Sequence, residues 1–549
     1  MMVIKGGTQP PHFFLGLWRV LLLSLAVLCA PAQGAELSPS LQSALDDLAG
    51  RDKALRLDAI ERIANSGSEA SETLLQVILD GELYRWKSEN RFVRGEKAGR
   101  KFDLYALEDG AALATVGRRE AKKVSINNTL RGAVKSALAT LDLVASDRDK
   151  RLAGVRAQFG THAVPVERID SLLDTEEDPA VRDALSNLRA MTLVSDEAAT
   201  GDALTEAIGA LGASNEPAAL TPLKNRLART EDEAEQATLA RAIKAFESRQ
   251  TRYAIVKQVF FGLSLGSILV LAAIGLAITF GVMGVINMAH GELIMLGAYT
   301  TWAMQQLLPG QPGAALLLAI PMGFVVSASV GMAMERLAIS KLYGRPLETL
   351  LLTFGFSLIL QQAVRTFISA RNVAVSNPSW MSGSLELHPM LSLTLNRVVI
   401  LFFCLMVFAV LWWVMQRTRF GLQLRAVTQH REMARCVGVR SRRIDTLTFG
   451  LGAGLAGLAG VALSQLGNVG PNLGQAWIVD SFLVVVFGGV GNLWGTLIGG
   501  LGIGVVTKLI EPWSGAVLAK IVLLVAVILF IQRRPRGLFP PSGRSAGDS

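Results

Sequence analysis

Cysteine and histidine are scarce in this chain, which has three cysteines and five histidines among 549 residues. No cysteine lies between residues 36 and 250, so that part of the chain has neither a disulfide framework nor a cysteine-based metal site. His290 and Glu292 lack the HExxH pairing and the third ligand that a zinc hydrolase needs. The sequence therefore predicts no metal site, no cofactor and no catalytic residue.

A nucleotide-binding loop is also missing, because the pattern G-x-x-x-x-G-K followed by Ser or Thr occurs nowhere in the chain. Charged residues make up only 18% of the sequence, hydrophobic residues make up 51%, and the mean hydropathy is +0.39. The apolar residues are concentrated after Tyr253, which predicts a soluble part followed by a membrane part. The net charge of +9 comes largely from residues 417–443 and Arg533–Arg536, so a cytoplasmic excess of arginine explains it better than nucleic-acid binding.

Residues 1–35 have the three parts of a secretory signal peptide. Lys5 supplies the positive charge, residues 20–28 form the apolar core, and small residues follow at Ala30–Ala35. The apolar core is short for a membrane span, although an uncleaved anchor remains the alternative. This pattern predicts that the segment that follows is exported.

Residues 36–250 are charged and rich in alanine and leucine, with apolar residues at spacings of three and four. Paired short amphipathic helices of this kind predict a mainly helical, HEAT-like exported domain, here a periplasmic one. The segment 83–127 differs, because it has several aromatic residues and the runs KFDLY and KKVSI. We therefore expect a small β insertion there.

Residues 251–535 are predicted to form an all-α polytopic membrane domain of about nine transmembrane helices, followed by a cytoplasmic tail at 536–549. The nine apolar segments lie at residues 256–280, 283–306, 314–336, 347–369, 397–416, 446–466, 476–490, 494–510 and 515–532. An odd number of crossings places the exported domain outside and the arginine-rich tail inside, as positively charged residues prefer.

Residues 417–443 carry eight arginines and a single acid, Glu432, between two apolar segments. This imbalance places the loop on the cytoplasmic side of the membrane. Its middle, 422–438, is expected to form one short amphipathic helix that ends at a glycine stop signal. Such a helix suits docking into a groove on a soluble partner, and the alternative is a loop that only sets topology.

This arginine-rich loop resembles the coupling loop of ABC importer permeases of the branched-chain amino-acid type, in which a short helix lies on the ATPase. The most similar subgroup is the urea ABC transporter permeases, and the segments 280–299, 468–496 and 511–540 also resemble that family. The coupling residues that the resemblance implies are Arg425, Gln429, His430, Met433, Ala434, Arg435 and Gly438. The family usually has Asn where this chain has His430.

The resemblance implies several partners and no nucleic acid. They are cytoplasmic ABC ATPase subunits, a second permease subunit, a periplasmic solute-binding protein and membrane lipid. The partner ATPase would use the ATP, and the predicted location is the bacterial inner membrane.

The stretch 287–292, Asn-Met-Ala-His-Gly-Glu, lies where two apolar segments meet and glycines interrupt the pattern. A broken helix frees backbone groups to face a substrate path, and ionisable residues at such a depth mark functional sites. The alternative is a polar cytoplasmic turn. The candidate path or gate residues are Asn287, His290, Glu292, Thr353, Ser357, Asn468, Asn472, Asp480 and Asn492. Glu335, near a span end, is expected to be a neutral control position.

Small residues at a spacing of four, as in Gly450-Gly454 and Ala456-Gly460, let helices approach closely in lipid. We expect them to pack helices within the chain or to form an interface with the second permease.

The hypothesis that best unites these features is a permease subunit of an ABC importer that moves urea across the inner membrane. Urea is neutral and planar, so a path for it needs amides, hydroxyls and carbonyls more than fixed charge. The alternatives are a permease for branched-chain amino acids or short amides and a stand-alone facilitative channel.

Overall fold

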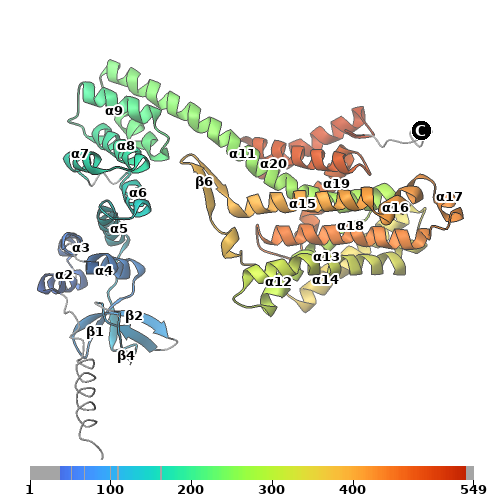
Figure 1. Ribbon diagram of the computed structural model, residues 1–549, viewed down its shortest axis with the longest axis horizontal. Helices are drawn as coiled ribbons and strands as arrows, with labels where there is room; N and C mark the ends of the chain where they lie inside the picture. The colour runs from blue at the N-terminus through green and yellow to red at the C-terminus, as the bar shows by residue number, and fades with distance from the viewer. Residues whose placement is uncertain are drawn as a thin grey trace, which may run out of the picture. The chain divides into compact units, whose positions relative to one another are not determined.

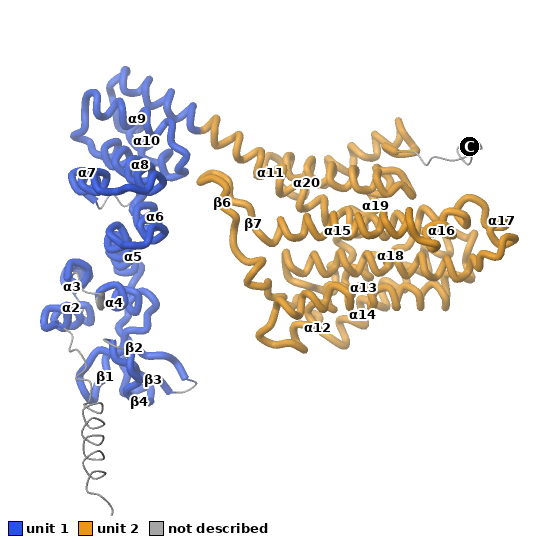
Figure 2. Tube along the Cα trace, in the orientation of Figure 1, with its two compact units in different colours: residues 1–246 blue, residues 247–549 orange. Residues whose placement is uncertain are grey.

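The computed structural model describes residues 38–50, 52–66, 69–98, 101–107, 110–160 and 164–539. It divides the chain into two compact units, Met1–Phe246 and Glu247–Ser549 (Figure 2). The predicted signal peptide and the last ten residues of the predicted tail lie outside the described residues.

Unit 1 consists of short helices interrupted by one small sheet (Figure 1). Its helices are α2 (Pro39–Ala49), α3 (Lys53–Asn65), α4 (Glu69–Asp80), α5 (Asn128–Asp142), α6 (Arg148–Ala157), α7 (Val166–Thr175), α8 (Pro179–Ser195), α9 (Asp202–Ala213), η1 (Pro217–Ala219) and α10 (Leu220–Leu227). Leu45, Ile60 and Leu75 from the first three helices pack together in a buried core, since apolar residues recur on one face of each helix. The HEAT-like repeat stays a prediction.

The sheet lies in the segment for which the sequence predicted strands. Its strands are β1 (Leu83–Trp86), β2 (Arg91–Ala98), β3 (Lys101–Tyr105), β4 (Ala112–Gly117) and β5 (Ala121–Lys123). They pair antiparallel in the order β4-β3-β2-β1-β5. Tyr84, Val93 and Leu104 are buried on one face, as the two-residue period of strands requires.

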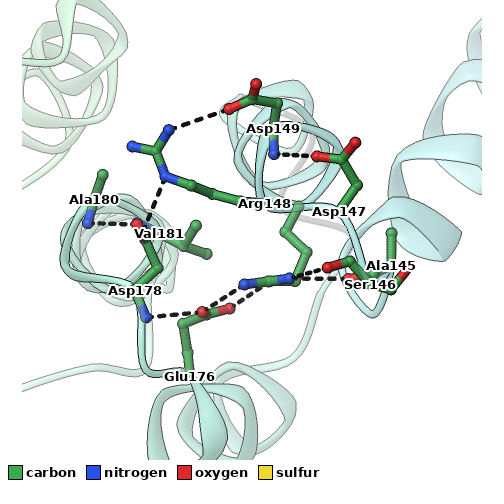
Figure 3. A network of polar contacts seen from close by, with 10 residues as sticks. Ala145, Ser146, Asp147, Arg148, Asp149, Glu176, Asp178, Ala180 and Val181 are labelled. Carbon is green, nitrogen blue, oxygen red and sulfur yellow. Dashed lines mark hydrogen bonds and ion pairs between the residues drawn. The ribbon is translucent and has the colours of Figure 1, made fainter.

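Two loops of unit 1 are joined by one arginine. Arg151 donates two hydrogen bonds to Glu176, at 2.7 and 2.9 Å, and two more to the carbonyl oxygens of Ala145 and Ser146. Asp178 accepts from two amides of the first turn of α8 and from Arg148 (Figure 3). Because these bonds favour the charged carboxylate, they lower the pKa of Glu176 from its ordinary value of 4.5 and that of Asp178 from 3.8.

Unit 2 is a bundle of long apolar helices. Helix α11 (Glu233–Met283) begins in unit 1 and ends in unit 2. The elements that follow are α12 (His290–Leu307), α13 (Pro312–Leu337), η2 (Ile339–Lys341), α14 (Pro346–Phe367), η3 (Ser379–Met381), β6 (Ser384–His388), β7 (Leu391–Thr394), α15 (Leu395–Arg417), α16 (Arg419–Gln429), α17 (Arg431–Cys436), α18 (Ser441–Ser464), α19 (Leu473–Gly488) and α20 (Leu493–Arg533).

Among the described residues, six helices are long and apolar enough to cross a membrane: α11, α13, α14, α15, α18 and α20. Helix α19 is apolar but shorter, at 16 residues, and α12 has 18. The two predicted segments 494–510 and 515–532 both lie in α20, whose helix is interrupted at Gly515, where φ is 77°. The count of nine crossings stays a prediction.

Helix α18 lies at the centre of the bundle, against α12 and α13 (Figure 1). A Cβ added at Gly457 would overlap Gly323 and Ser327 of α13, and one added at Gly460 would overlap Ile294 of α12. The small residues of α18 therefore pack helices within this chain, as one of the two expectations had it. They are buried here against other helices of the same chain, and an interface with a second permease stays a prediction.

Removing the Glu176 carboxylate should destabilise unit 1. Glu176→Gln keeps the shape but loses a charge-assisted hydrogen-bond pair, and we expect a cost of about 1–3 kcal/mol. Hydrogen exchange of the α7 and α8 amides in the full chain measures it. The exposed pair of Arg229 and Glu197 offers the control, because Glu197→Gln should change exchange by no more than about 0.5 kcal/mol.

The ion pair of Arg151 and Glu176 also predicts how the stability of unit 1 depends on pH. Since the folded pKa of Glu176 is lowered, its contribution is complete above the unfolded value near 4.5 and is lost as the pH falls through the folded value. Protection factors, corrected for the intrinsic exchange rate at each pH, should fall below pH 4.5 in the wild-type protein, but less in Glu176→Gln. An equal fall in both proteins would contradict this role for the carboxylate.

Candidate functional site

Two helix starts meet inside unit 2. Helix α11 ends at Met283, the next six residues are not helical, and α12 begins at His290. A Cβ added at Gly291 would overlap the backbone of Gly474, in the first turn of α19, and the reverse is also true. The starts of α12 and α19 are thus in backbone contact, which only glycine permits. The positive ends of two helix dipoles lie close together there.

A carboxylate lies one residue beyond this contact. Glu292 is 1% exposed, and its Oε1 accepts hydrogen bonds from Ser357 at 3.0 Å and from Gln361 at 2.7 Å. Both partners come from α14, which presents polar residues on the face turned towards α12. The side chain of Glu292 is therefore fixed from one side, and Oε2 has no partner among the described residues.

The non-helical stretch before α12 is fixed by side chains. Asn287 is 1% exposed, and its Oδ1 accepts from the amide of Ala289 at 3.0 Å. Thr353 of α14 accepts from the amide of Met288 at 3.1 Å. Asn287 and Ala289 are thus buried within this stretch, and the amide nitrogen Nδ2 of Asn287 has no partner among the described residues.

His290 has no exposed surface and points towards α11. Its Nε2 lies 2.8 Å from the carbonyl oxygen of Ala272, so Nε2 carries the proton and donates. Nδ1 is then an acceptor, and no described residue donates to it. His290 thus ties the start of α12 to the preceding helix.

Of the nine predicted path residues, Thr353 and Ser357 of α14 bond the stretch 287–292, through the amide of Met288 and through Glu292. Asn287 bonds within that stretch, and His290 faces α11 instead. The other four lie elsewhere. Asn468 is exposed, and Asn472, also exposed, accepts from Arg365 at 2.7 Å. Asn492 accepts from the amide of Gly495 and caps α20, because a cap side chain satisfies a free amide of the first turn. Asp480 pairs with Lys520.

Sequence reasoning missed Gln361. The buried positions of α14 recur every fourth residue, at Thr349, Thr353, Ser357 and Gln361. Residues four apart share one helix face, so the spacing alone could have identified Gln361. Among the described residues no group of three or more His, Cys, Asp or Glu side chains could hold a metal ion.

Three buried side-chain atoms of the stretch 287–292 have no partner among the described residues: the donor Asn287 Nδ2 and the acceptors Glu292 Oε2, on the side of α14, and His290 Nδ1, on the side of α11. Buried polar atoms without partners are costly, at about 1–3 kcal/mol each, so they mark places where another group completes the bonding. A small polar solute that both donates and accepts hydrogen bonds would suit them.

The arginine-rich loop contains two helices where the sequence predicted one. Helices α16 and α17 are separated by His430, whose φ of −150° and ψ of 93° are extended. The predicted single helix over 422–438 is therefore wrong at its middle. Gly438 has a φ of 87°, a backbone conformation that glycine adopts readily, so the predicted stop at this residue is confirmed.

Several residues of the predicted coupling set serve the loop itself. Arg425 donates to the carbonyl oxygen of Met415 at 2.6 Å, Arg435 donates to Ser441 at 2.9 Å, and Ala434 is buried. Gln429, His430 and Gly438 are exposed, as is Met433. Three apolar side chains of the loop are exposed: Leu422 at 63%, Met433 at 66% and Val437 at 73%.

A buried polar network lies beneath α17. Glu335 of α13 is fully buried, and its two oxygens accept from Tyr343 at 2.7 Å and from Thr446 of α18 at 2.6 Å. Glu335, expected from the sequence to serve as a span-end control, is therefore unsuited to that use because it is buried and bonded. Most residues around Glu335 in the sequence are apolar and give no sign that its carboxylate bonds α18 and the turn after α13.

One ion pair connects this network to α17. Arg431 donates to Asp445 of α18 at 2.7 Å and lies over the Tyr343 ring, 5.6 Å from its centroid. The Asp445 side chain is only 2% exposed, so breaking this pair would leave a buried charge without its partner. A displacement of α17 would thus act on α13 and α18 through side chains that are already in contact.

Comparison with known proteins gives one family. The family described as "Branched-chain amino acid transport system / permease component" matches residues 258–531. The high-affinity branched-chain amino acid transport system permease protein LivH of Salmonella typhimurium is 30% identical over 292 residues, which cover 52% of this chain and 94% of LivH. BraD of Pseudomonas aeruginosa, of the same description, is 31% identical over 299 residues, covering 52% of this chain and 96% of BraD.

More distant likenesses concern shorter stretches. The ribose import permease protein RbsC of Bacillus subtilis is 31% identical over 134 residues, which cover 22% of this chain and 42% of RbsC. No solved structure matches significantly.

The network beneath α17 should contribute to stability. Tyr343→Phe and Thr446→Val each remove one donor to the buried Glu335 carboxylate, which costs about 1–3 kcal/mol per bond. Thermal unfolding of the purified chain in detergent should occur at a lower temperature in both variants. Tyr253→Phe is the matched control, since the Tyr253 hydroxyl makes a long hydrogen bond, 3.4 Å, to His388, while the stacking of the two rings does not need the hydroxyl. An equal effect in all three variants would contradict a special role for Glu335.

Proposed function

This chain belongs to the family of branched-chain amino acid transport permease components, and we propose that it imports a small polar nitrogen compound as the membrane subunit of an ABC transporter. The single observation that supports this best is the buried cluster of unsatisfied polar atoms at the contact of Gly291 and Gly474. Helix breaks that place backbone and side-chain groups inside a bundle are typical of transporter substrate sites.

Membership of the family implies an ATPase and a solute-binding protein as partners, and the pattern of a nucleotide-binding loop is absent from this sequence. We propose that a second permease subunit completes the translocation path and that the chain crosses the inner membrane nine times. In this arrangement the partner ATPase docks on α16 and α17, and its movement reaches the bundle through Arg431 and Asp445.

The first substrate candidate is a branched-chain amino acid, because LivH and BraD carry that description. Its carboxylate would suit the positive ends of α12 and α19, and its ammonium group would suit the free oxygen of Glu292. The apolar helices around the cluster would accommodate its side chain.

Urea is the second candidate, and the chemistry of the cluster favours it. Asn287 Nδ2 matches the urea carbonyl, while Glu292 Oε2 matches its amide hydrogens. Arg365, one turn beyond Gln361 on α14, interacts with the charge of Glu292, so a neutral solute needs no counter-charge there. The family model and the relatives named above also leave most of unit 1 unmatched, so this chain differs from them in a whole domain.

Uptake in cells that express the complete transporter tests both the function and the substrate. Radiolabelled L-leucine and urea should separate the candidates, and only one should accumulate in an ATP-dependent manner. Glu292→Gln and Asn287→Ala should reduce that uptake about tenfold, as the loss of one buried hydrogen bond would.

Glu348→Gln is the control for this experiment, because Glu348 pairs with Arg345 while both side chains are more than half exposed. Normal uptake in all three variants would reduce the cluster to a structural turn. Accumulation of neither solute by the wild-type transporter would overturn both substrate candidates.

Docking of the ATPase should depend on the exposed apolar residues of α17 and its end. Met433→Asp and Val437→Asp place a charge where a partner surface would bury the side chain, so uptake should fall about tenfold while membrane insertion is retained. Val144→Asp, at a position 60% exposed in unit 1, is the control. Full uptake by both loop variants would show that the ATPase binds elsewhere.

Unit 1 is proposed to be periplasmic. A cysteine in place of Glu197, whose side chain is 78% exposed, should react with a membrane-impermeant thiol reagent in cells with a permeabilised outer membrane. The native Cys436 is exposed and belongs to the proposed cytoplasmic loop, so it should react only after the inner membrane is broken. Labelling of Cys436 in intact cells, and of position 197 only after the inner membrane is broken, would show that unit 1 is cytoplasmic.

A further inference from the structure

A second cavity in unit 2 lies away from the helix contact described above. It has a volume of about 200 Å³ and is enclosed by α11, α19 and the two halves of α20. Most of its wall is apolar, with Leu269, Trp477 and Ile503 among the lining residues. Four charged side chains also line it: Asp480, Lys508, Glu511 and Lys520.

These four charges form two ion pairs. Lys520 lies 2.7 Å from Asp480, and Lys508 lies 2.6 Å from Glu511. The side chains keep between 20% and 56% of their surface exposed, so the pairs are open to the cavity rather than sealed in the core. Charged residues within apolar helices are costly and usually serve a function.

The wall of the cavity therefore has a defined chemistry. It offers two ammonium groups and two carboxylates, with no net charge, beside an apolar surface. A ligand with a single charge could bond only the residues of opposite sign and would add a net charge to the cavity. A zwitterion can bond a carboxylate with its ammonium group and a lysine with its anionic group, so the cavity stays neutral. We propose that this cavity binds a small zwitterion, an ammonium group and an anionic group joined to a short apolar part.

Two sources would supply that chemistry. One is a free amino acid with an apolar side chain, and this source rests on the proposed transport function. The other is the head group of a zwitterionic phospholipid, whose acyl chains would lie along exposed apolar residues further along α20, such as Val525 at 50% and Leu529 at 58%. The shared requirement is the pair of opposite charges.

The position of the cavity connects it to the helix contact. Helix α19 provides Gly474 to the contact and, three and six residues later, Trp477 and Asp480 to the cavity. Ala516 lines the cavity next to Gly515, where α20 is broken. A bound zwitterion would therefore touch both α19 and the break in α20.

Protection of a cysteine measures occupancy directly. Ala516→Cys is placed in a background in which Cys29, Cys404 and Cys436 are replaced by Ser, and the full chain is reconstituted in phosphatidylglycerol nanodiscs, which contain no zwitterionic lipid. Maleimide labelling is followed with L-leucine, with phosphatidylethanolamine, with urea, and with isovalerate and isoamylamine, which each lack one of the two charges of leucine. Val517→Cys, the exposed neighbour outside the cavity wall, is the matched control.

We expect a zwitterion near ten times its dissociation constant to slow labelling of Ala516→Cys about tenfold and to leave Val517→Cys unchanged. Protection by leucine identifies an amino-acid site, and protection by phosphatidylethanolamine alone identifies a lipid site. The combined substitutions Asp480→Asn and Lys520→Met should remove the protection, since they keep the volume and delete the charges. Protection by neither zwitterion, or equal protection by the singly charged analogues or urea, would overturn the proposal.

The outcome is separable from that of the transport assay. Normal ATP-dependent uptake without protection would reject the cavity as a zwitterion site and leave the proposed function intact. Protection by a zwitterion in a transporter that accumulates no solute would do the reverse.

Discussion

The contact between Gly291 and Gly474 is the constraint on which the rest of unit 2 depends. No side chain fits between the two backbones, so the starts of α12 and α19 can come this close only because both residues are glycine. Because both helices begin at this contact, their free amide groups and the polar residues of the preceding stretch are held inside an apolar bundle. Glu292, Asn287 and His290 keep unsatisfied atoms for that reason, and α14 contributes hydroxyl and amide groups that fix the carboxylate.

A second buried polar network, at the other end of α18, gives the bundle a connection to its surface. Arg431 of α17 pairs with Asp445, and the adjacent Thr446 shares the Glu335 carboxylate with Tyr343. Helix α18 then passes through the bundle to its close contacts with α12 near Ile294. A force applied to α17 therefore reaches the polar cluster through one buried helix, which is the physical requirement for coupling ATP hydrolysis in a partner to movement here.

Much of this could be predicted from sequence, because apolar periodicity and glycine position are local properties. The division into a polar and an apolar part, the helix break before His290 and the polar positions Thr353 and Ser357 all follow from such patterns. The hydrogen-bonding partners of individual side chains could not be predicted, since they depend on packing between segments that are distant in the sequence. Asn472 bonds Arg365 outside the buried cluster, and Glu335, which lies among apolar residues, is a buried acceptor. His430 breaks the loop helix although no Gly or Pro marks it.

The central claim is that the helix contact holds the transport site together, and one substitution tests it most directly. Gly474→Ala adds a single methyl group that would overlap the backbone of Gly291, while Gly502→Ala adds one where no atom lies within 4 Å. Uptake by the complete transporter should be lost in Gly474→Ala and retained in Gly502→Ala, with both proteins present in the membrane at wild-type levels. Wild-type uptake by Gly474→Ala would contradict the account.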